Sequence, residues 1–226
     1  MPDPISAVVP AFNEGETIAA VIAYLSRAPE VAEVIVVDNN STDDTAAVAT
    51  AAGARVVTET RQGMGHAFKA GVAAARHDWV MKVDADLERF GPELVTRLAG
   101  ARAPGIGLVK GAWQDPGDDM PMTRLLVQPA VAALCPSLST LTAPNSGIYL
   151  MDRSRIAHTE LRGNYAVDLD AMLRMAWAGH GVTEVDIGQI ENDKRNPAHY
   201  SAMAHEIMRF FLDCARDRPE ASPPPF

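Results

Sequence analysis

Three short polar motifs in the first half of the chain each follow an apolar run. Residues 10–14 read Pro-Ala-Phe-Asn-Glu, residues 38–43 read Asp-Asn-Asn-Ser-Thr-Asp, and residues 84–86 read Asp-Ala-Asp. Two aspartates this close together offer the oxygen ligands that hard divalent cations such as Mg²⁺ and Mn²⁺ prefer. Each motif alone also has a structural explanation, since Asn, Ser and Asp favour turns and helix starts. Their common position after apolar runs indicates a shared site.

Alternating strands and helices would position these motifs. Runs rich in apolar and β-branched residues predict strands at residues 5–9, 34–37, 55–57 and 79–83. Helical periodicity and composition predict the helices between them, at residues 17–27, 43–53 and 65–76. This alternation predicts an α/β fold with a mostly parallel sheet and helices on both faces. Ligands bind such a sheet at the carboxyl ends of its strands, which is where all three motifs fall.

Residue type also indicates where elements begin and end. Ser41 or Thr42 is expected to cap the second helix. Pro92 suits the first turn of the next helix, and Pro129 predicts a kink or break in a helix over residues 122–134. The other elements of the second half are expected at residues 108–113, 147–151 and 182–187 for strands, and at residues 167–178 and 200–216 for helices.

Together the motifs resemble those of nucleotide-sugar glycosyltransferases of the family 2 type, which have the GT-A fold. Pro-x-x-Asn-Glu, Asp-x-x-Ser-Thr-Asp and an Asp-x-Asp after an apolar strand are the marks of that family, and they stand here in order between residue 5 and about residue 98. Further segments are similar to the glucosyl-3-phosphoglycerate synthases and their mannosyl relatives, at residues 126–129, 144–149, 165–170 and 185–188.

The resemblance implies a single GT-A (Rossmann-like) domain. Residues 1–105 would form its nucleotide-sugar-binding half, residues 106–218 its acceptor-binding half and residues 219–226 a flexible tail. It also implies a metal-dependent hexosyltransferase that retains the anomeric configuration. The donor would be of the UDP-glucose or GDP-mannose type, and the acceptor a small polar molecule such as a glycerate or phosphoglycerate. Mg²⁺ or Mn²⁺ would neutralise the charge that develops on the departing diphosphate.

Other functions remain open from the sequence. An inverting transferase that acts on a polyprenyl phosphate or a glycan would carry the same nucleotide motifs. A nucleotidyltransferase shares the sheet and the metal, but residues 10–14 stand where its glycine-rich basic loop belongs. A catalytically inactive sugar-nucleotide binder is a further alternative, because Met64 stands where retaining relatives have the lysine of Gly-Lys-Gly.

The resemblance suggests roles for individual residues. We assign Asp86 as the direct metal ligand, with Asp84 sharing the metal or facing the ribose, and Asn192 stands where relatives have a metal-binding histidine. Asp38 would accept hydrogen bonds from the nucleobase, and two glycines would let the backbone approach the nucleotide closely. The residues expected to bind the nucleotide sugar are Pro10, Ala11, Phe12, Asn13, Glu14, Asp38, Gly63, Gly65, Asp84 and Ala85.

The residues expected to bind the acceptor are Lys110, Arg124, Asn145, Ser146 and Gly147. Lys110 is equally well explained as a surface lysine, and the Asn-Ser-Gly triplet as a simple turn. Where relatives place arginine, the following loop carries Asp115, Asp118 and Asp119, which disfavour a phosphate at close range. Arg124 is the nearest replacement, so the sequence leaves open an acceptor other than 3-phosphoglycerate.

Asp168 and Asp170 open a predicted helix and are the candidate catalytic residues. In inverting relatives an acidic residue near this position is the general base for the acceptor hydroxyl. In retaining relatives the matching acid binds hydroxyl groups of the donor sugar. Acidic residues are also favoured in the first turn of any helix. We favour Asp168 over Asp170 for a role in the site.

Charge, apolar runs and cysteine content limit the kinds of partner and the location expected for this protein. The formal net charge of −9 argues against a nucleic-acid-binding protein, which needs a basic face. The sequence predicts neither a signal peptide nor an apolar run long enough to cross a membrane. Cys135 and Cys214 are expected to be buried, reduced thiols of a cytoplasmic protein. The apolar face of the last helix either pairs two copies into a homodimer or packs on its own domain; it consists of Met203, Ile207, Phe210 and Phe211.

Overall fold

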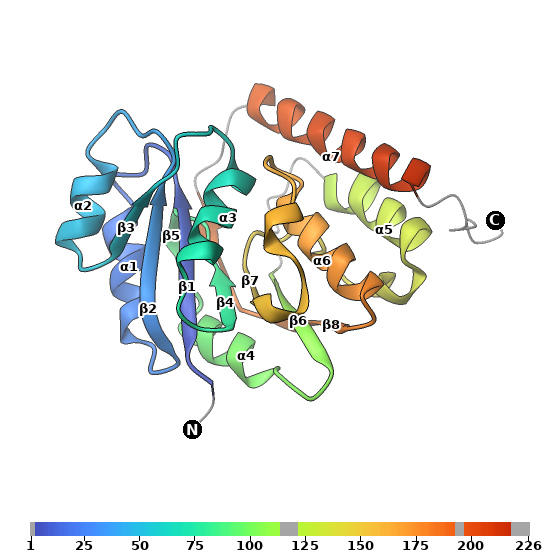
Figure 1. The fold of residues 1–226 in the computed structure, drawn as a ribbon, viewed down its shortest axis with the longest axis horizontal. Coiled ribbons are helices and arrows are strands. Elements are labelled where there is room, and N and C mark those ends of the chain that lie inside the picture. The colour runs from blue at the N-terminus through green and yellow to red at the C-terminus, as the bar shows by residue number, and fades with distance from the viewer. Residues whose placement is uncertain (1–2, 114–121, 193–196, 218–226) are drawn as a thin grey trace.

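A seven-stranded sheet forms the centre of the molecule (Figure 1). The structure is a computed structural model that describes residues 3–113, 122–192 and 197–217, with the backbone alone at residues 191–192 and 197–199. Along the sheet the strands are β3 (Arg55–Thr58), β2 (Val31–Asp38), β1 (Ile5–Ala11), β4 (Trp79–Lys82), β7 (Tyr149–Asp152), β6 (Ile106–Ala112) and β8 (Gly181–Asp186). β7 runs antiparallel to β4 and β6, whereas the other neighbouring pairs are parallel. The predicted α/β fold with a mostly parallel sheet is confirmed.

Helices cover both faces of this sheet (Figure 1). Successive strand residues point to opposite faces, so Val8 belongs to one hydrophobic cluster and its neighbours Ala7 and Val9 to the other. The helices that contribute to the Val8 cluster are α3 (Met64–Ala74), α5 (Gln128–Leu134), α6 (Val167–Trp177) and α7 (Pro197–Asp217). Those that contribute to the other cluster are α1 (Ile18–Arg27), α2 (Thr45–Ala51) and α4 (Leu94–Gly100).

Two helix boundaries test expectations from residue type. α2 has Asp44 at its N-cap, so the prediction that Ser41 or Thr42 caps this helix is wrong. Both side chains are used instead by the polar motif after β1. Pro129 lies in the first turn of α5, directly after a π-helical turn at Thr123–Val127. Because proline cannot donate a backbone hydrogen bond, it suits a helix start. The backbone at Val127 and Gln128 stays in the helical region, so the structure shows a change from π-helix to α-helix near Pro129 rather than a break between two helices.

A second, two-stranded sheet pairs β5 (Leu87–Arg89) with β9 (Glu191–Asn192) in antiparallel fashion. The sequence does not predict these strands, because segments of three and two residues are too short to show a strand period. The register pairs Leu87, which directly follows Asp86, with Asn192. The small sheet therefore brings a late segment of the chain next to the third polar motif.

The apolar face of α7 packs on its own domain. Ile207, Phe210 and Phe211 are buried, and Met203 packs against the same hydrophobic cluster. The other alternative that the sequence left open, a homodimer formed through these four residues, does not agree with this burial.

Three further expectations concern the rest of the chain. Cys135 and Cys214 are both free and buried, as expected. Among the described helices, none is both long and apolar enough to span a bilayer. The expected tail at residues 219–226 and the Asp-rich loop at residues 114–121 lie outside the described residues.

Candidate active site

All three polar motifs lie at one edge of the main sheet. Ala11 pairs with Asp38 at the carboxyl ends of β1 and β2, and β4 ends beside them at Lys82. β7 runs the other way, and its first residue, Tyr149, pairs with Lys82. The turn at residues 145–147, which precedes a strand, therefore reaches the same edge as the motifs that follow strands.

A cavity of about 910 Å³ opens at this edge. Its walls come from all three motifs, the start of α3, the turn before β7, the segment before α6, and residues of α6 and α7. Of the residues expected to bind donor, acceptor or metal, those that line it are Pro10, Ala11, Phe12, Glu14, Gly63, Asp84, Ala85, Asp86, Asn145, Gly147 and Asp168. The structure thus brings together residues from both halves of the chain.

Hydrogen bonds join the first two motifs to each other. Asn13 has a left-handed backbone with φ of 58°, and its Oδ1 accepts a hydrogen bond from Thr42 N at 2.8 Å. Its own backbone N donates to Ser41 Oγ at 3.0 Å. Asp38 is buried, and its Oδ1 accepts a hydrogen bond from Ser41 N at 3.3 Å. Asn13 and Asp38 therefore shape this edge, and neither belongs to the described residues that line the cavity.

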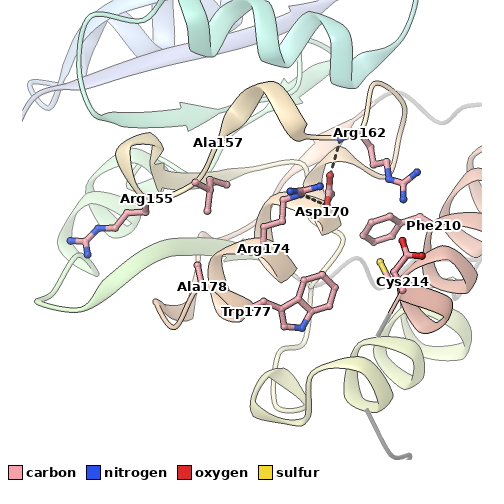
Figure 2. A pocket seen from close by; sticks show the side chains of 11 residues that line it. Arg155, Ala157, Arg162, Asp170, Arg174, Trp177, Ala178, Phe210 and Cys214 are labelled. Carbon is pink, nitrogen blue, oxygen red and sulfur yellow. Dashed lines mark hydrogen bonds and ion pairs between the residues drawn. The ribbon is translucent and has the colours of Figure 1, made fainter. Parts of the chain in front are cut away.

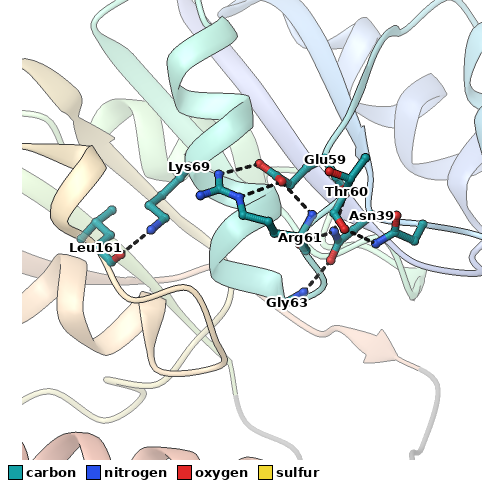
Figure 3. A network of polar contacts seen from close by, with 8 residues as sticks. Asn39, Glu59, Thr60, Arg61, Gly63, Lys69 and Leu161 are labelled. Atoms are coloured by element: carbon teal, nitrogen blue, oxygen red, sulfur yellow. Dashed lines mark hydrogen bonds and ion pairs between the residues drawn. The ribbon is translucent and has the colours of Figure 1, made fainter.

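Asn39 holds the loop that follows β3 (Figure 3). Its Nδ2 donates to the carbonyl oxygens of Glu59 at 2.7 Å and Arg61 at 2.8 Å, and its Oδ1 accepts from Gly63 N at 2.8 Å. The Arg61 guanidinium binds the Glu59 carboxylate at 3.0 and 2.9 Å, and this hydrogen bonding lowers the pKa of Glu59 to about 2. Asn39 itself lines the cavity, together with residues 62–64. Asn39 is not among the residues predicted for the site, although it lies inside the second motif.

Gly63 and Gly65 allow a close approach of the chain to itself. A Cβ atom at Gly65 would lie 2.1 Å from Arg162 O, and one at Gly63, where φ is 140°, would lie 2.4 Å from Gly163 O. The start of α3 therefore packs directly on the segment before α6. The expectation that both glycines admit the nucleotide needs correction: Gly63 lines the cavity, whereas the contact that requires Gly65 is made by Arg162.

Lys82 is fully buried at the end of β4 and binds two carboxylates. Its Nζ lies 2.7 Å from Asp84 Oδ1 and 3.3 Å from Asp168 Oδ2, and it donates to Gly147 O at 3.2 Å. Burial alone would lower the pKa of Lys82, but Asp168 and Asp84 raise it above its ordinary value. Burial raises the pKa of Asp168, and Lys82 opposes that rise. Lys82 is not among the residues predicted for the site; its signal in the sequence is a lysine within an otherwise apolar strand.

Lys110 is fully buried in β6, so its interpretation as a surface lysine is wrong. Its Nζ donates to Ser146 O at 2.6 Å and lies 4.5 Å from the centre of the Tyr149 ring. Burial lowers the pKa of Lys110 to about 8. Among the described residues, the cation has carbonyl and aromatic neighbours rather than a carboxylate in direct contact. The predicted contact of Lys110 with an acceptor remains a prediction.

Comparison with known proteins identifies the family. Residues 6–119, which carry all three motifs, match the model described as glycosyl transferase family 2. The chain belongs to this family. The glycosyltransferase is 33% identical over 236 residues to the glucosyl-3-phosphoglycerate synthase of Mycolicibacterium paratuberculosis, in an alignment that covers 92% of this chain and 71% of that protein.

Solved structures extend the similarity to the whole domain of this glycosyltransferase. One is glucosyl-3-phosphoglycerate synthase from Mycobacterium tuberculosis in complex with Mn²⁺, UDP-glucose and phosphoglyceric acid, with a TM-score of 0.83, 32% identity, and coverage of 94% of this chain and 79% of that chain. The same enzyme in complex with Mg²⁺ and UDP gives a TM-score of 0.83, 32% identity and coverage of 94% and 79%. The fold is therefore the GT-A fold that the motifs implied.

The residues expected to bind the acceptor are not all in one place in this glycosyltransferase. Asn145 and Gly147 line the cavity. Ser146 is buried, and its hydroxyl is hydrogen-bonded at 3.1 Å to the backbone two residues further on. Arg124 is exposed in the π-helical turn before α5. The neighbouring Thr123 hydroxyl donates to Asn145 Oδ1 at 2.9 Å, which links that turn to the cavity wall.

The two acidic residues at the start of α6 line different cavities. Asp168 lines the main cavity, whereas Asp170 lines a smaller one of about 450 Å³ formed with residues of α7 (Figure 2). There the Asp170 carboxylate accepts hydrogen bonds at 2.8 Å from Arg174 Nε and at 2.8 Å from Arg162 N. Because these contacts account for both of its oxygens, we keep Asp168 alone as the candidate catalytic acid.

The third motif offers carboxylates for a divalent cation. Asp86 is half-buried and lines the cavity. Asp84 also lines it, but its Oδ1 is bound to Lys82. The side chain of Asn192 lies outside the described residues. Within the described ranges, no group of three or more His, Cys, Asp or Glu side chains is arranged to hold a metal. One or two carboxylates nevertheless fit Mg²⁺, which commonly takes its other ligands from substrate phosphates and water.

Proposed function

We propose that this glycosyltransferase transfers a hexose from a donor of the UDP-glucose type to a small polar acceptor, such as a glycerate or phosphoglycerate, with retention of the anomeric configuration. The observation that carries the proposal is a single cavity lined by Phe12, Asp86 and Asp168, residues that come from both halves of the chain. The relative's complex with UDP-glucose and phosphoglyceric acid supports the choice of donor and acceptor class.

The nucleoside is assigned to the loop after β1. Phe12 is 47% exposed although it lines the cavity, so its ring offers an apolar face for a nucleobase. Asn13 supports this loop through Ser41 and Thr42. Asn39 supports the wall at residues 62–64 in the same way. The residues that contact the donor are therefore held in place before it binds, which lowers the ordering cost of binding.

Asp86 is the residue that would hold Mg²⁺ or Mn²⁺, and Asp84 is the second candidate ligand. A bound divalent ion supplies a Lewis acid that stabilises the charge of a leaving diphosphate. The Asp86 side chain would orient that ion against the donor. Asp84 can offer it one oxygen, because the other is bound to the Lys82 ammonium at 2.7 Å.

Asp168 is assigned to the reacting sugar. Its Oδ2 lies 3.3 Å from Lys82 Nζ. Its Oδ1 is buried and makes no hydrogen bond of good geometry among the described residues, although the buried Tyr149 hydroxyl, which also makes none, interacts with this carboxylate. Buried polar atoms are normally satisfied, so we assign a hydroxyl of the donor sugar, beside the Tyr149 hydroxyl, to this carboxylate oxygen. In the inverting alternative the same carboxylate would take the proton from the acceptor hydroxyl.

The acceptor is assigned to the side of the cavity formed by Asn145 and Gly147. Arg124, exposed on the adjoining π-helical turn, is the cation we propose for an acidic group of the acceptor. A carboxylate and a phosphate would both suit a guanidinium. Glycerate and phosphoglycerate therefore both belong in the test.

The experiment is a transfer assay with purified protein. UDP-glucose and GDP-mannose are each combined with glycerate, 3-phosphoglycerate or glycerol 3-phosphate, in the presence of Mn²⁺, Mg²⁺ or EDTA. We expect metal-dependent turnover of one donor with one of these acceptors, and NMR of the product should show the donor's anomeric configuration. A product of the opposite configuration would support the inverting alternative. Saturable binding of UDP-glucose without turnover on any acceptor would support an inactive sugar-nucleotide binder.

A further inference from the structure

The Lys82 ammonium connects three separate segments of the chain. Its Nζ binds Asp84 Oδ1 at 2.7 Å in the third motif, Gly147 O at 3.2 Å in the turn before β7, and Asp168 Oδ2 at 3.3 Å at the start of α6. The first segment belongs to the predicted nucleotide-sugar-binding half and the other two to the predicted acceptor-binding half. Two of the three residues it binds carry charge, and all three line the cavity.

The ammonium is buried more deeply than either carboxylate. The side chain of Lys82 has no exposed surface, whereas 27% of Asp84 and 8% of Asp168 is exposed. Both neighbours of Lys82 in the chain, Met81 and Val83, are apolar and buried. A buried cation is costly unless charged partners compensate it, so an apolar side chain would suit this strand position better for folding alone.

Lys82 and Gly147 together fix the position of Asp84. One carboxylate oxygen, Oδ1, is held by the ammonium. The other, Oδ2, lies so close to Gly147 that a Cβ atom there would be 2.0 Å from it. Asp84 is therefore held from two sides, and Asp86, which follows two residues later, has no part in the Lys82 contacts described.

We propose that Lys82 is a positioning residue of the transfer reaction. It holds Asp84 Oδ1 away from the metal, so that Asp86 is the principal carboxylate ligand, and it fixes the Asp168 carboxylate at the reacting sugar. The inference rests on the proposed function and adds to it a residue that acts through Asp84 and Asp168 rather than by touching the substrate.

The first test is Lys82→Met, which keeps the length of the side chain and removes the charge. We expect kcat to fall about 100-fold with the KM for UDP-glucose changed by less than about threefold, because Asp168 loses its partner while the nucleoside loop is untouched. Mn²⁺ should bind the UDP complex about threefold or more tightly, since a nearby positive charge is removed and Asp84 is released. This affinity is measured by electron paramagnetic resonance with MnCl₂ and UDP, without turnover. Lys69→Met is the matched control, because Lys69 is a partly buried lysine whose hydrogen bond within the described residues goes to Leu161 O at 2.8 Å.

The second test is the double variant Lys82→Met/Asp168→Asn, which removes both charges together and so does not leave the Asp168 carboxylate buried without its cation. If Lys82 acts through Asp168, the double variant should have a kcat close to that of Asp168→Asn alone. The proposal would be overturned if the double variant lost kcat by the product of the two single-variant losses. It would also be overturned if folded Lys82→Met protein had unchanged kcat, or bound Mn²⁺ with unchanged or lower affinity. If the wild type transfers no sugar, the proposed function fails, and the Mn²⁺ affinity of the Lys82→Met–UDP complex then decides the inference.

Discussion

Asp168 and Asp170 are two positions apart in α6, yet their carboxylates lie in different cavities and have different partners. Asp168 contacts Lys82 at the main cavity, and Asp170 contacts Arg174 at the smaller one. Two residues span about 200° of rotation on an α-helix, so one face cannot present both side chains. Substitutions at the two positions can therefore distinguish the role of Asp168 from that of Asp170.

Asp170→Asn is expected to lower stability and to leave catalysis largely intact. The substitution removes the charge that pairs with Arg174, which should lower the free energy of unfolding by about 1–3 kcal/mol. Turnover should stay within about threefold of the wild type, because the main cavity keeps its lining. Urea unfolding and steady-state kinetics measure the two effects. A variant as stable as the wild type but with strongly reduced kcat would contradict this assignment.

Asp86→Asn is expected to reduce kcat/KM by about 100- to 1,000-fold and to weaken Mn²⁺ binding, because an amide replaces the charged ligand. Glu88→Gln is the matched control, since Glu88 is an exposed acid two residues further on. The control should keep its activity and its Mn²⁺ affinity. Titration of turnover with MnCl₂ compares the two variants, and wild-type turnover of Asp86→Asn would refute the metal assignment.

Asn39→Ala is expected to weaken UDP binding about tenfold, because the loop at residues 59–63 loses three hydrogen bonds and must be ordered when the nucleotide binds. The same loss should cost about 1–3 kcal/mol of stability. Calorimetry with UDP and urea unfolding measure both. Asn40→Gly is the control: it removes two exposed hydrogen bonds in the same loop and tolerates the local φ of 66°. Unchanged UDP affinity in Asn39→Ala would limit this residue to a folding role.

Lys110 should make stability depend on pH in the alkaline range. Its pKa is about 8 in the folded protein, against about 10.4 in an unfolded chain. Below pH 8, Lys110 is protonated in both the folded and the unfolded protein, and the free-energy cost of burying the cation is fully present. Above pH 8, Lys110 loses its proton in the folded protein first, so this cost to stability declines as the pH rises. Relative to Lys110→Met, the wild type should therefore gain about 1–3 kcal/mol between pH 7 and pH 10. Urea unfolding of both proteins measures this difference, and a constant difference would show that Lys110 titrates as it does in the unfolded chain.

The sequence was sufficient to predict where the main strands lie along the chain and the edge of the sheet where the motifs meet. Strand and helix periods are local, and the carboxyl ends of parallel strands share one edge. It was not sufficient to predict contacts set by three-dimensional packing. Nothing near Lys82 in the sequence indicates that Asp168, from a distant helix, compensates its charge. Ser41 and Thr42 resemble helix caps locally, but the packing of β1 beside β2 makes them partners of Asn13.

Gly65→Ala is expected to destabilise the protein by about 3 kcal/mol or more, because the new Cβ would meet backbone atoms that cannot move aside. It would lie 2.1 Å from Arg162 O. Gly100→Ala, where nothing lies within 4 Å of the added atom, should be neutral or slightly stabilising. Thermal unfolding of the two variants compares them, and equal melting temperatures would contradict the packing described at α3.

The contact between α3 and Arg162 also affects how the tolerance of position 65 to substitution is interpreted in a mutational scan. In a saturation library selected for activity, position 65 should accept glycine almost exclusively, as strictly as a position that touches substrate. Ranking positions by tolerance would therefore place Gly65 among the ligand contacts, although its constraint comes from a backbone passing over it. Pairing the selection with an abundance assay separates the two causes, because Gly65 variants should be lost from the cell, whereas Asp86 variants should accumulate as inactive protein.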